Sequence, residues 1–319
     1  MSVASSTPPD RQFRLTSWLM LAPFVILFAT FTVWPLIRSI QMAMTKSAGP
    51  QVREFVGLGN FAFLMRDERF WHAVGNTVLY TGAFVGVSMS LALLLAIAVD
   101  QRRLRFKTAF RYAFFCPHLV GSVFAAVIFS QVFARDGWLN AVLVSAPNAA
   151  SAWLSGLVAH VGLHLPVLHL APPAWLGEPT LALWALVLCG VWLSTGYMMV
   201  YLLAALQSVD RHLYEAAAID GAGPFARFRD VTLPGIRPTL LFLILSATIG
   251  ALQLFELPYL LTGGAGPRDS TLTVVGYLYA EGFEVGNLGH ASAVGWTLVL
   301  LCGALSAFQL RRSHFLKDD

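Results

Sequence analysis

Polar side chains inside long apolar runs are the residues of this chain that could contact a substrate. Ser194, Tyr197, Gln253 and Glu256 interrupt two such runs. The ring of Tyr197 can pack on the C–H face of a sugar, and the amide of Gln253 can donate to and accept from hydroxyl groups. We expect these two residues, with Ser194, to line a path for a polar solute, and Glu256 to be a gate or a structural residue. The alternative is that all four only form hydrogen bonds between helices.

Metal and nucleotide chemistry are not expected. His160 and His164 stand four residues apart, but no carboxylate or cysteine lies near them in the sequence, so we predict no metal site. The cysteines lack metal-ligand spacing and are expected to be small apolar side chains: Cys116, Cys189 and Cys302. A Walker A loop requires Gly-Lys, whereas the lysines follow Thr, Phe and Leu: Lys46, Lys107 and Lys317. The chain is therefore expected to be no enzyme, to have no catalytic residues and to hold no cofactor, and energy for transport must come from a partner.

The composition is typical of a polytopic membrane protein. Of the 319 residues, 57% are hydrophobic and only 12% are charged, whereas a soluble domain has roughly 25% charged residues. The formal net charge of +4 is what basic loops beside membrane spans produce, so no nucleic-acid partner is expected.

The sequence predicts an all-α fold with six membrane-crossing helices, because a span needs about 20 mostly apolar residues. Pro117 and His118 are expected to mark a kink in the third span. We predict a membrane domain of residues 16–314, a disordered tail of residues 1–15 and a short tail of residues 315–319. The six spans are predicted at approximately 18–37, 73–99, 112–133, 180–209, 238–260 and 285–310.

Positively charged loops predict the orientation, because Lys and Arg concentrate on the cytoplasmic side of a membrane. With the N-terminus inside, most of them fall in cytoplasmic loops, so both termini are predicted to be cytoplasmic. Residues 137–177 contain no Asp, Glu, Lys or Arg. We expect an external loop with interfacial helices there, and a seventh span around Trp153 to Leu170 is the alternative.

A polar segment, residues 210–237, lies between the fourth and fifth predicted spans and is predicted to fold as helix, tight turn, helix. Asp210 can cap a short helix that runs to about Asp220, and Gly221 can end it in the left-handed conformation. Gly223 gives a second turn, and Pro224 suits the first position of another short helix. Leu233-Pro234 and Arg237-Pro238 are expected to stop that helix and start the fifth span. Fixed turns and alanine packing favour a surface that docks on another protein, over an ordinary solvated loop.

The polar segment resembles the EAA motif of the membrane subunits of bacterial ATP-binding-cassette importers. The matching residues are Glu215, Ala216, Ala217, Gly221 and the run Val231-Thr232-Leu233-Pro234, and LYEAAAIDGAGPF is similar to the maltose-type permeases. The resemblance implies a type I importer permease fold in which this segment sits in a cleft of the ATPase subunit. It makes Glu215 and Gly221 the central contacts, with Ala216, Ala217, Asp220, Gly223 and Pro224 around them.

Further segments resemble the carbohydrate branch of the same superfamily, and together they cover nearly the whole chain except its N-terminal tail and residues 141–174. LTGGAGPRDSTLTVVGYLYAEGF departs from the family pattern by one extra residue, Ala265. The resemblance implies a second, different permease subunit, two ATPase subunits that bind ATP and magnesium, and an extracytoplasmic solute-binding protein. It places the chain in the cell (inner) membrane of a bacterium, as part of a sugar or oligosaccharide importer.

Three other functions stay open on the sequence. An importer for glycerol-3-phosphate, a polyol or another polar solute is the nearest, although a phosphate substrate would call for basic groups that the fourth and fifth spans lack. A membrane enzyme would need paired acidic or metal-binding residues at a membrane interface. A proton-coupled carrier would need a buried relay of Asp, Glu or His and would have no use for the polar segment.

Overall fold

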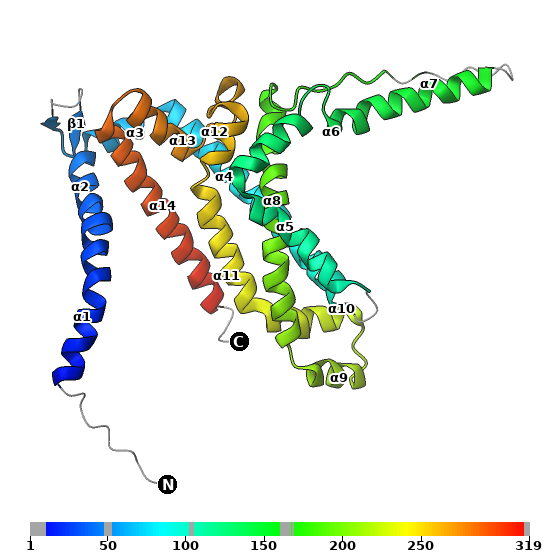
Figure 1. Ribbon diagram of the computed structural model, residues 1–319, viewed down its shortest axis with the longest axis horizontal. Helices are drawn as coiled ribbons and strands as arrows, with labels where there is room; N and C mark the ends of the chain where they lie inside the picture. Colours follow the sequence, from blue (N-terminus) through cyan, green and yellow to red (C-terminus); the bar gives the residue numbers. More distant parts are fainter. Residues whose placement is uncertain (1–10, 48–52, 102–104, 160–166, 168, 316–319) are drawn as a thin grey trace, which may run out of the picture. The chain divides into compact units, whose positions relative to one another are not determined.

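The computed structural model describes residues 11–47, 53–101, 105–159, 167 and 169–315. Two compact units are present (Figure 1). The first unit comprises Met1–Met65 and Ala280–Trp296, and the second comprises Arg66–Tyr279 and Thr297–Asp319. The predicted disordered tail of residues 1–15 is contradicted at residues 11–15, which belong to the first helix. Its first ten residues, the C-terminal tail from residue 316 and the pair His160 and His164 lie outside the described residues.

The first unit holds the N-terminal helices and a small cap. Helix α1 (Arg11–Phe28) continues through a π-helical turn, η1 (Ala29–Val33), into α2 (Trp34–Ala43). Strands β1 (Thr45–Ser47) and β2 (Arg53–Phe55) pair antiparallel, and α3 (Gly59–Leu64) follows. The buried Asn60 amide donates to the carbonyl oxygens of Ala43 at 2.8 Å and Thr45 at 3.0 Å, so α3 closes the end of α2.

The second unit is built around long apolar helices that pack into one core. They are α4 (Glu68–Asp100), α5 (Lys107–Val132), α8 (Pro179–Ser208) and α11 (Leu233–Leu252). Shorter elements follow: α12 (Glu256–Thr262), η4 (Pro267–Asp269) and α13 (Val274–Tyr279). After them, η5 (Ala280–Glu284) and the first part of α14 (Leu288–Phe315) belong to the first unit. Because α8 is apolar on all sides, it lies in the middle of this core, and residues such as Leu186, Met199 and Leu202 are fully buried.

Six helices among the described residues are long and apolar enough to cross a membrane, as the sequence predicts. Large apolar side chains on their outer faces are exposed, which suits contact with lipid and not with water. The six stretches are Trp18–Ala43, Glu68–Asp100, Lys107–Val132, Pro179–Ser208, Pro224–Leu252 and Leu288–Gln309.

Two helices depart from the sequence prediction. The short helix expected to stop at Leu233-Pro234 instead continues from α10 (Pro224–Arg227) through a π-helical turn, η3 (Phe228–Thr232), into α11. Pro234 directly follows the π-helical turn, and membrane helices tolerate internal prolines such as Pro234 and Pro238. The fifth span therefore ends at Leu252, not near residue 260. In the third span the non-helical residue is Gly121 (φ 78°, ψ 163°), and not Pro117 or His118.

The uncharged stretch forms helices in its described part. Helix α6 (Trp138–Asn140) continues through η2 (Ala141–Ser145) into α7 (Ala146–Ala159). The buried Asn140 amide donates to the Pro173 carbonyl at 3.1 Å, and Asn140 accepts a hydrogen bond from the Trp175 indole at 2.9 Å. These two hydrogen bonds join the beginning of the uncharged stretch, at Asn140, to its end, at Pro173 and Trp175. The choice between an external loop and a seventh span stays a prediction, since residues 160–166 are not described.

Candidate functional site

The polar segment begins with a capped helix, α9 (Arg211–Ile219). The Asp210 carboxylate accepts a hydrogen bond from the His212 backbone N–H at 2.9 Å, so Asp210 is the N-cap that the sequence predicts. Helix α9 buries none of its residues. Glu215 is exposed, and its carboxylate lies 3.5 Å from the His212 imidazole, between Oε2 and Nδ1. The Glu215 carboxylate is thus available to another molecule.

Helix α9 ends in a Schellman motif around Gly221. The Ala222 N–H donates to the Ala217 carbonyl at 2.9 Å, and the Gly221 N–H donates to the Ala218 carbonyl at 3.2 Å. Gly221 has φ 75°, which confirms the predicted left-handed conformation. A Cβ atom at Gly221 would meet nothing within 4 Å, so the backbone conformation alone requires glycine here.

The turn after α9 leads directly into the fifth span. Gly223 is the N-cap of α10, with Pro224 in the first turn as predicted. The Arg227 guanidinium donates to the Ala222 carbonyl at 2.8 Å. The Tyr214 and Thr232 hydroxyl oxygens lie 2.9 Å apart, and Thr232 is buried. These two contacts attach α9 and its turn to the helix that becomes α11.

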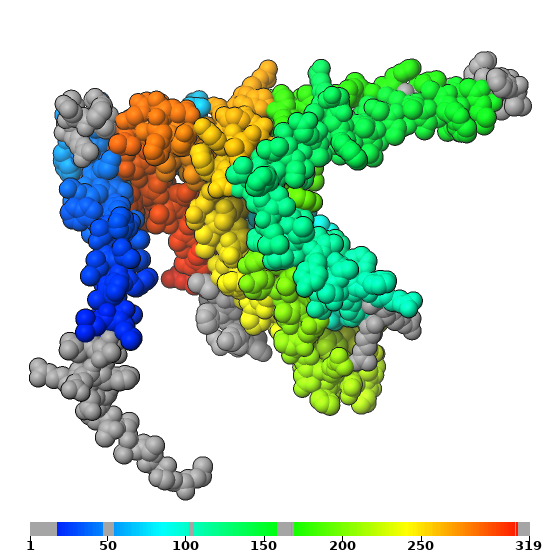
Figure 2. All heavy atoms as spheres, viewed as in Figure 1, coloured from blue at the N-terminus to red at the C-terminus, as the bar shows by residue number. Residues whose placement is uncertain are grey.

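The outward face of the polar segment carries exposed apolar side chains. Figure 2 shows α9 and α10 as a projecting yellow-green surface. Ile219 is 87% exposed and Phe225 is 75% exposed, and Leu213 is also exposed. Exposed apolar side chains on a polar segment make this face a candidate surface for binding another protein.

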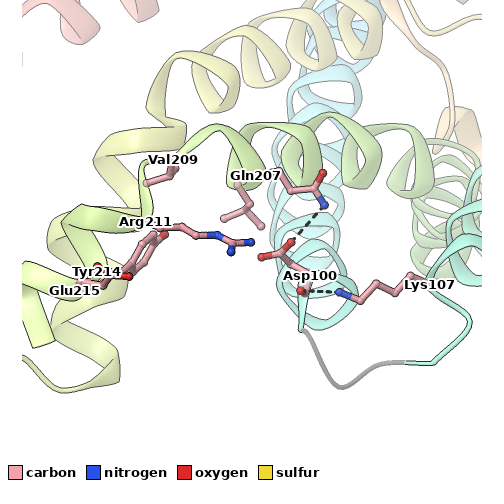
Figure 3. Close-up of a pocket in the computed structure, with 8 residues that line it drawn as sticks. Asp100, Lys107, Gln207, Val209, Arg211, Tyr214 and Glu215 are labelled. Carbon is pink, nitrogen blue, oxygen red and sulfur yellow. Dashed lines mark hydrogen bonds between the residues drawn. The ribbon is translucent and has the colours of Figure 1, made fainter.

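A polar pocket lies between α9 and the ends of three spans (Figure 3). Its volume is about 640 Å³. The Asp100 carboxylate accepts from the Gln207 amide at 3.4 Å, and the Asp100 carbonyl accepts from Lys107 Nζ at 3.0 Å. The other lining residues come from α9 and the chain that leads to it: Leu206, Val209, Arg211, Tyr214 and Glu215.

A second cavity, of about 260 Å³, lies inside the bundle of the second unit. Ser194 and Tyr197 line it, as the sequence predicts for a substrate path. Gln253 and Glu256 are not among its lining residues. The others come from α4, α5, α8, α11 and the chain after it: Tyr80, Phe84, His118, Gly190, Leu193, Met198, Leu243, Ser246, Ala247, Gly250, Ala251, Leu254 and Leu257.

Aromatic rings are stacked at this cavity. The His118 ring lies 4.8 Å from the Tyr197 ring at an interplanar angle of 21°, and the Tyr201 ring lies 4.9 Å from Tyr197 on α8. Sequence reasoning missed His118 as a lining residue, because the neighbouring Pro117 suggested a kink. A histidine inside an apolar run was the available signal.

Gln253 and Glu256 instead lie at the break between α11 and α12. Gln253 is exposed and ends α11, and Glu256 begins α12 and accepts a hydrogen bond from the Ser122 hydroxyl. Leu254, between them, lines the cavity, and its carbonyl accepts from the Thr273 hydroxyl at 2.8 Å. The two predicted residues therefore flank the cavity wall without forming it.

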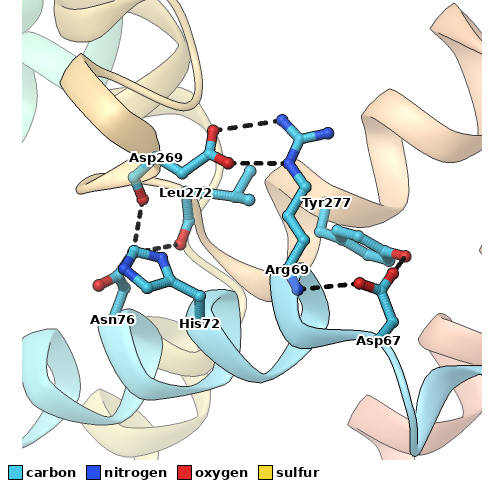
Figure 4. A network of polar contacts seen from close by, with 7 residues as sticks. All are labelled: Asp67, Arg69, His72, Asn76, Asp269, Leu272 and Tyr277. Carbon is cyan, nitrogen blue, oxygen red and sulfur yellow. Dashed lines mark hydrogen bonds and ion pairs between the residues drawn. The ribbon is translucent and has the colours of Figure 1, made fainter.

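A polar network anchors the segment that supplies Thr273 (Figure 4). The Arg69 guanidinium donates to both carboxylate oxygens of Asp269, at 2.9 and 3.2 Å. The Asn76 amide donates to the backbone carbonyls of Asp269 at 2.8 Å and Leu272 at 3.1 Å. Asp269 has φ 58°, a conformation that non-glycine residues rarely adopt. The network therefore fixes a strained turn against the N-terminal end of α4.

A metal centre has no candidate among the described residues, where no three His, Cys, Asp or Glu side chains are grouped to hold an ion. The cysteines are free thiols: Cys116, Cys189 and Cys302.

Comparison with known proteins assigns the family. Residues 123–312 match the model of the binding-protein-dependent transport system inner membrane component. The lactose transport system permease protein LacF of Rhizobium radiobacter is 32% identical over 97% of this chain and 97% of its own length. The arabinooligosaccharides transport system permease protein AraP of Bacillus subtilis is 30% identical, over 96% of this chain and 91% of its own.

A solved structure shows the same fold. A chain from the crystal structure of a bacterial ABC transporter involved in the import of the acidic polysaccharide alginate aligns with a TM-score of 0.74, covering 96% of this chain and 99% of that chain, at 22% identity. The family match spans both the polar segment and the helices that line most of the inner cavity. The chain therefore belongs to the binding-protein-dependent transport system inner membrane components, as a multi-pass membrane permease subunit.

Proposed function

We propose that this chain is one of two different permease subunits of an ATP-driven importer for a sugar or oligosaccharide. The polar segment carries the proposal. It is a rigidly capped helix with an exposed carboxylate and exposed apolar side chains, and it is continuous with a helix that lines the inner cavity. Two ATPase subunits, a second permease and an extracytoplasmic solute-binding protein complete the importer.

The polar segment is the surface on which the ATPase docks. Glu215 meets a basic group of the ATPase, and Ala216 and Ala217 allow close approach. The turn formed by Asp220, Gly221, Gly223 and Pro224 sets the direction in which α10 leaves. ATP and magnesium are bound by the ATPase, and both termini of this chain lie on that cytoplasmic side.

The inner cavity is part of the solute path, with Tyr197 and Ser194 in its wall. None of its lining residues is Asp, Glu, Lys or Arg, which favours a neutral polyhydroxy solute over glycerol-3-phosphate. The relatives named as permeases for lactose and for arabinooligosaccharides also support a sugar as the solute. Gln253, at the break between α11 and α12, meets the solute at one end of the cavity, and Glu256 holds α12 beside it.

Replacing Glu215 by Lys tests the docking surface. The substitution reverses an exposed charge that no core contact needs, so the subunit still inserts in the membrane while assembly with the ATPase or coupled ATP hydrolysis is lost. The measurement is co-purification of the ATPase together with solute-stimulated ATPase activity. Asp136→Lys, another exposed carboxylate, is the matched control and retains both. A Glu215→Lys importer that assembles and transports normally would show that the segment docks elsewhere.

Replacing Gly221 by Val tests the turn. Valine at φ 75° costs on the order of 1–3 kcal/mol of local strain and redirects α10. We expect a loss of transport-coupled ATPase activity. Gly221→Asn is the control, because asparagine adopts the left-handed conformation far more readily than valine. Equal activity of the two variants would contradict a requirement for the left-handed turn.

Replacing Tyr197 by Ala tests the solute path. If a buried hydroxyl of the solute loses its hydrogen-bond partner, binding weakens by about 1–3 kcal/mol. The rate of a step limited by binding then falls roughly 5- to 150-fold. We expect such a loss in transport, with assembly intact and the affinity of the solute-binding protein unchanged. Tyr197→Phe keeps the ring and separates stacking from hydrogen bonding. Gln253→Leu reports on the outer end of the path. Wild-type transport by both Tyr197→Ala and Gln253→Leu would place the path in the partner permease.

A further inference from the structure

Helices α5 and α8 are in close backbone contact at Gly196. A Cβ atom built there would lie 1.7 Å from the Phe114 carbonyl oxygen, so the two backbones touch. Val200 lies one turn further along α8. Beyond the contact a crevice of about 270 Å³ opens, lined by Thr108, Arg111, Tyr112, Phe115 and Val200.

Arg111 has an unsatisfied donor in this crevice. Its Nε atom is buried and has no hydrogen-bond partner among the described residues. A buried donor of a charged group without an acceptor costs free energy, so an acceptor from outside the chain is expected at this place. None of the described residues that line the crevice is a carboxylate, so the lining supplies no counter-charge to Arg111.

The surroundings of Arg111 determine which kind of anion fits. The crevice is mainly apolar, and Tyr112 beside it is 71% exposed on the outer surface of a candidate membrane span. Arg111 lies one turn from the start of that span at Lys107. The ends of membrane spans lie near the lipid headgroups, where tyrosine is also enriched. A ligand here needs an anionic head that can accept from a guanidinium and an apolar tail that can lie along Phe115 and Val200.

We propose that the crevice between α5 and α8 binds an anionic phospholipid, with the phosphate on Arg111 and one acyl chain along Phe115 and Val200. The phosphate oxygens accept from the guanidinium, including the buried Nε–H, as in other charge-assisted Arg–phosphate pairs. The Thr108 hydroxyl, at the mouth of the crevice, is a second donor to the phosphate. A lipid at this position fills the space beyond the Gly196 contact.

Native mass spectrometry of the assembled, detergent-purified importer titrated with phosphatidylglycerol tests the site. Arg111→Gln removes the charge and Thr108→Trp fills the mouth of the crevice while leaving Arg111 in place. We expect Arg111→Gln to weaken the tightest phosphatidylglycerol binding step about fivefold, the value of one basic residue near a membrane surface. Thr108→Trp is expected to weaken the same step because it blocks access to the crevice. Arg105→Gln, an exposed arginine just before α5 that does not line the crevice, binds the lipid like the unmodified protein.

Competing ligands separate the sources of the anion. Phosphatidylcholine, whose headgroup carries its own cation, binds more weakly than phosphatidylglycerol, and excess inorganic phosphate does not displace the lipid. Equal affinity in all four proteins would overturn the proposal. So would an equal loss in Arg105→Gln, which indicates unspecific surface charge, or displacement by inorganic phosphate, which indicates a soluble anion.

Discussion

The continuous helix from Pro224 to Leu252 is the constraint on which the rest of the account depends. Its first turns belong to the exposed polar segment, and its later residues, Leu243 to Ala251, line the inner cavity. The bond between Tyr214 and Thr232 attaches α9 to this helix. The polar segment and one wall of the inner cavity are therefore parts of the same continuous helix.

The chain directly after the end of that helix is also held by hydrogen bonds. At the break after Leu252, the Leu254 carbonyl is bonded to Thr273, and the chain near Thr273 is fixed by Arg69 and Asn76 on α4. Asp269 stays in its strained conformation because its carboxylate accepts hydrogen bonds from Arg69 and its carbonyl accepts one from Asn76. The cavity therefore lies between a helix that is continuous with the polar segment and an element that is bonded to α4.

The structure of the polar segment could be predicted because it depends on residues close in sequence. Features that depend on packing between distant helices could not be predicted. The Asp210 cap, the glycine turn and Pro224 depend on neighbours within a few residues, so the sequence alone indicates them. Pro234 and Pro238 were predicted to break the helix, because the π-helical turn that accommodates Pro234 leaves no sequence signal. His118 joins Tyr197 only through the packing of α5 on α8, and the place of Gln253 outside the cavity depends on where α11 ends.

The most direct test of the central claim is chemical crosslinking in the assembled importer, starting from a chain whose native cysteines are replaced. Ile219 on α9 is 87% exposed and Trp153 on α7 is 67% exposed. With a short bifunctional thiol-to-amine reagent, Ile219→Cys is predicted to link to the ATPase subunit, and Trp153→Cys is not. An importer in which Ile219→Cys stays unlinked to the ATPase, while it still hydrolyses ATP in response to solute, would contradict the claim that the polar segment is the docking surface.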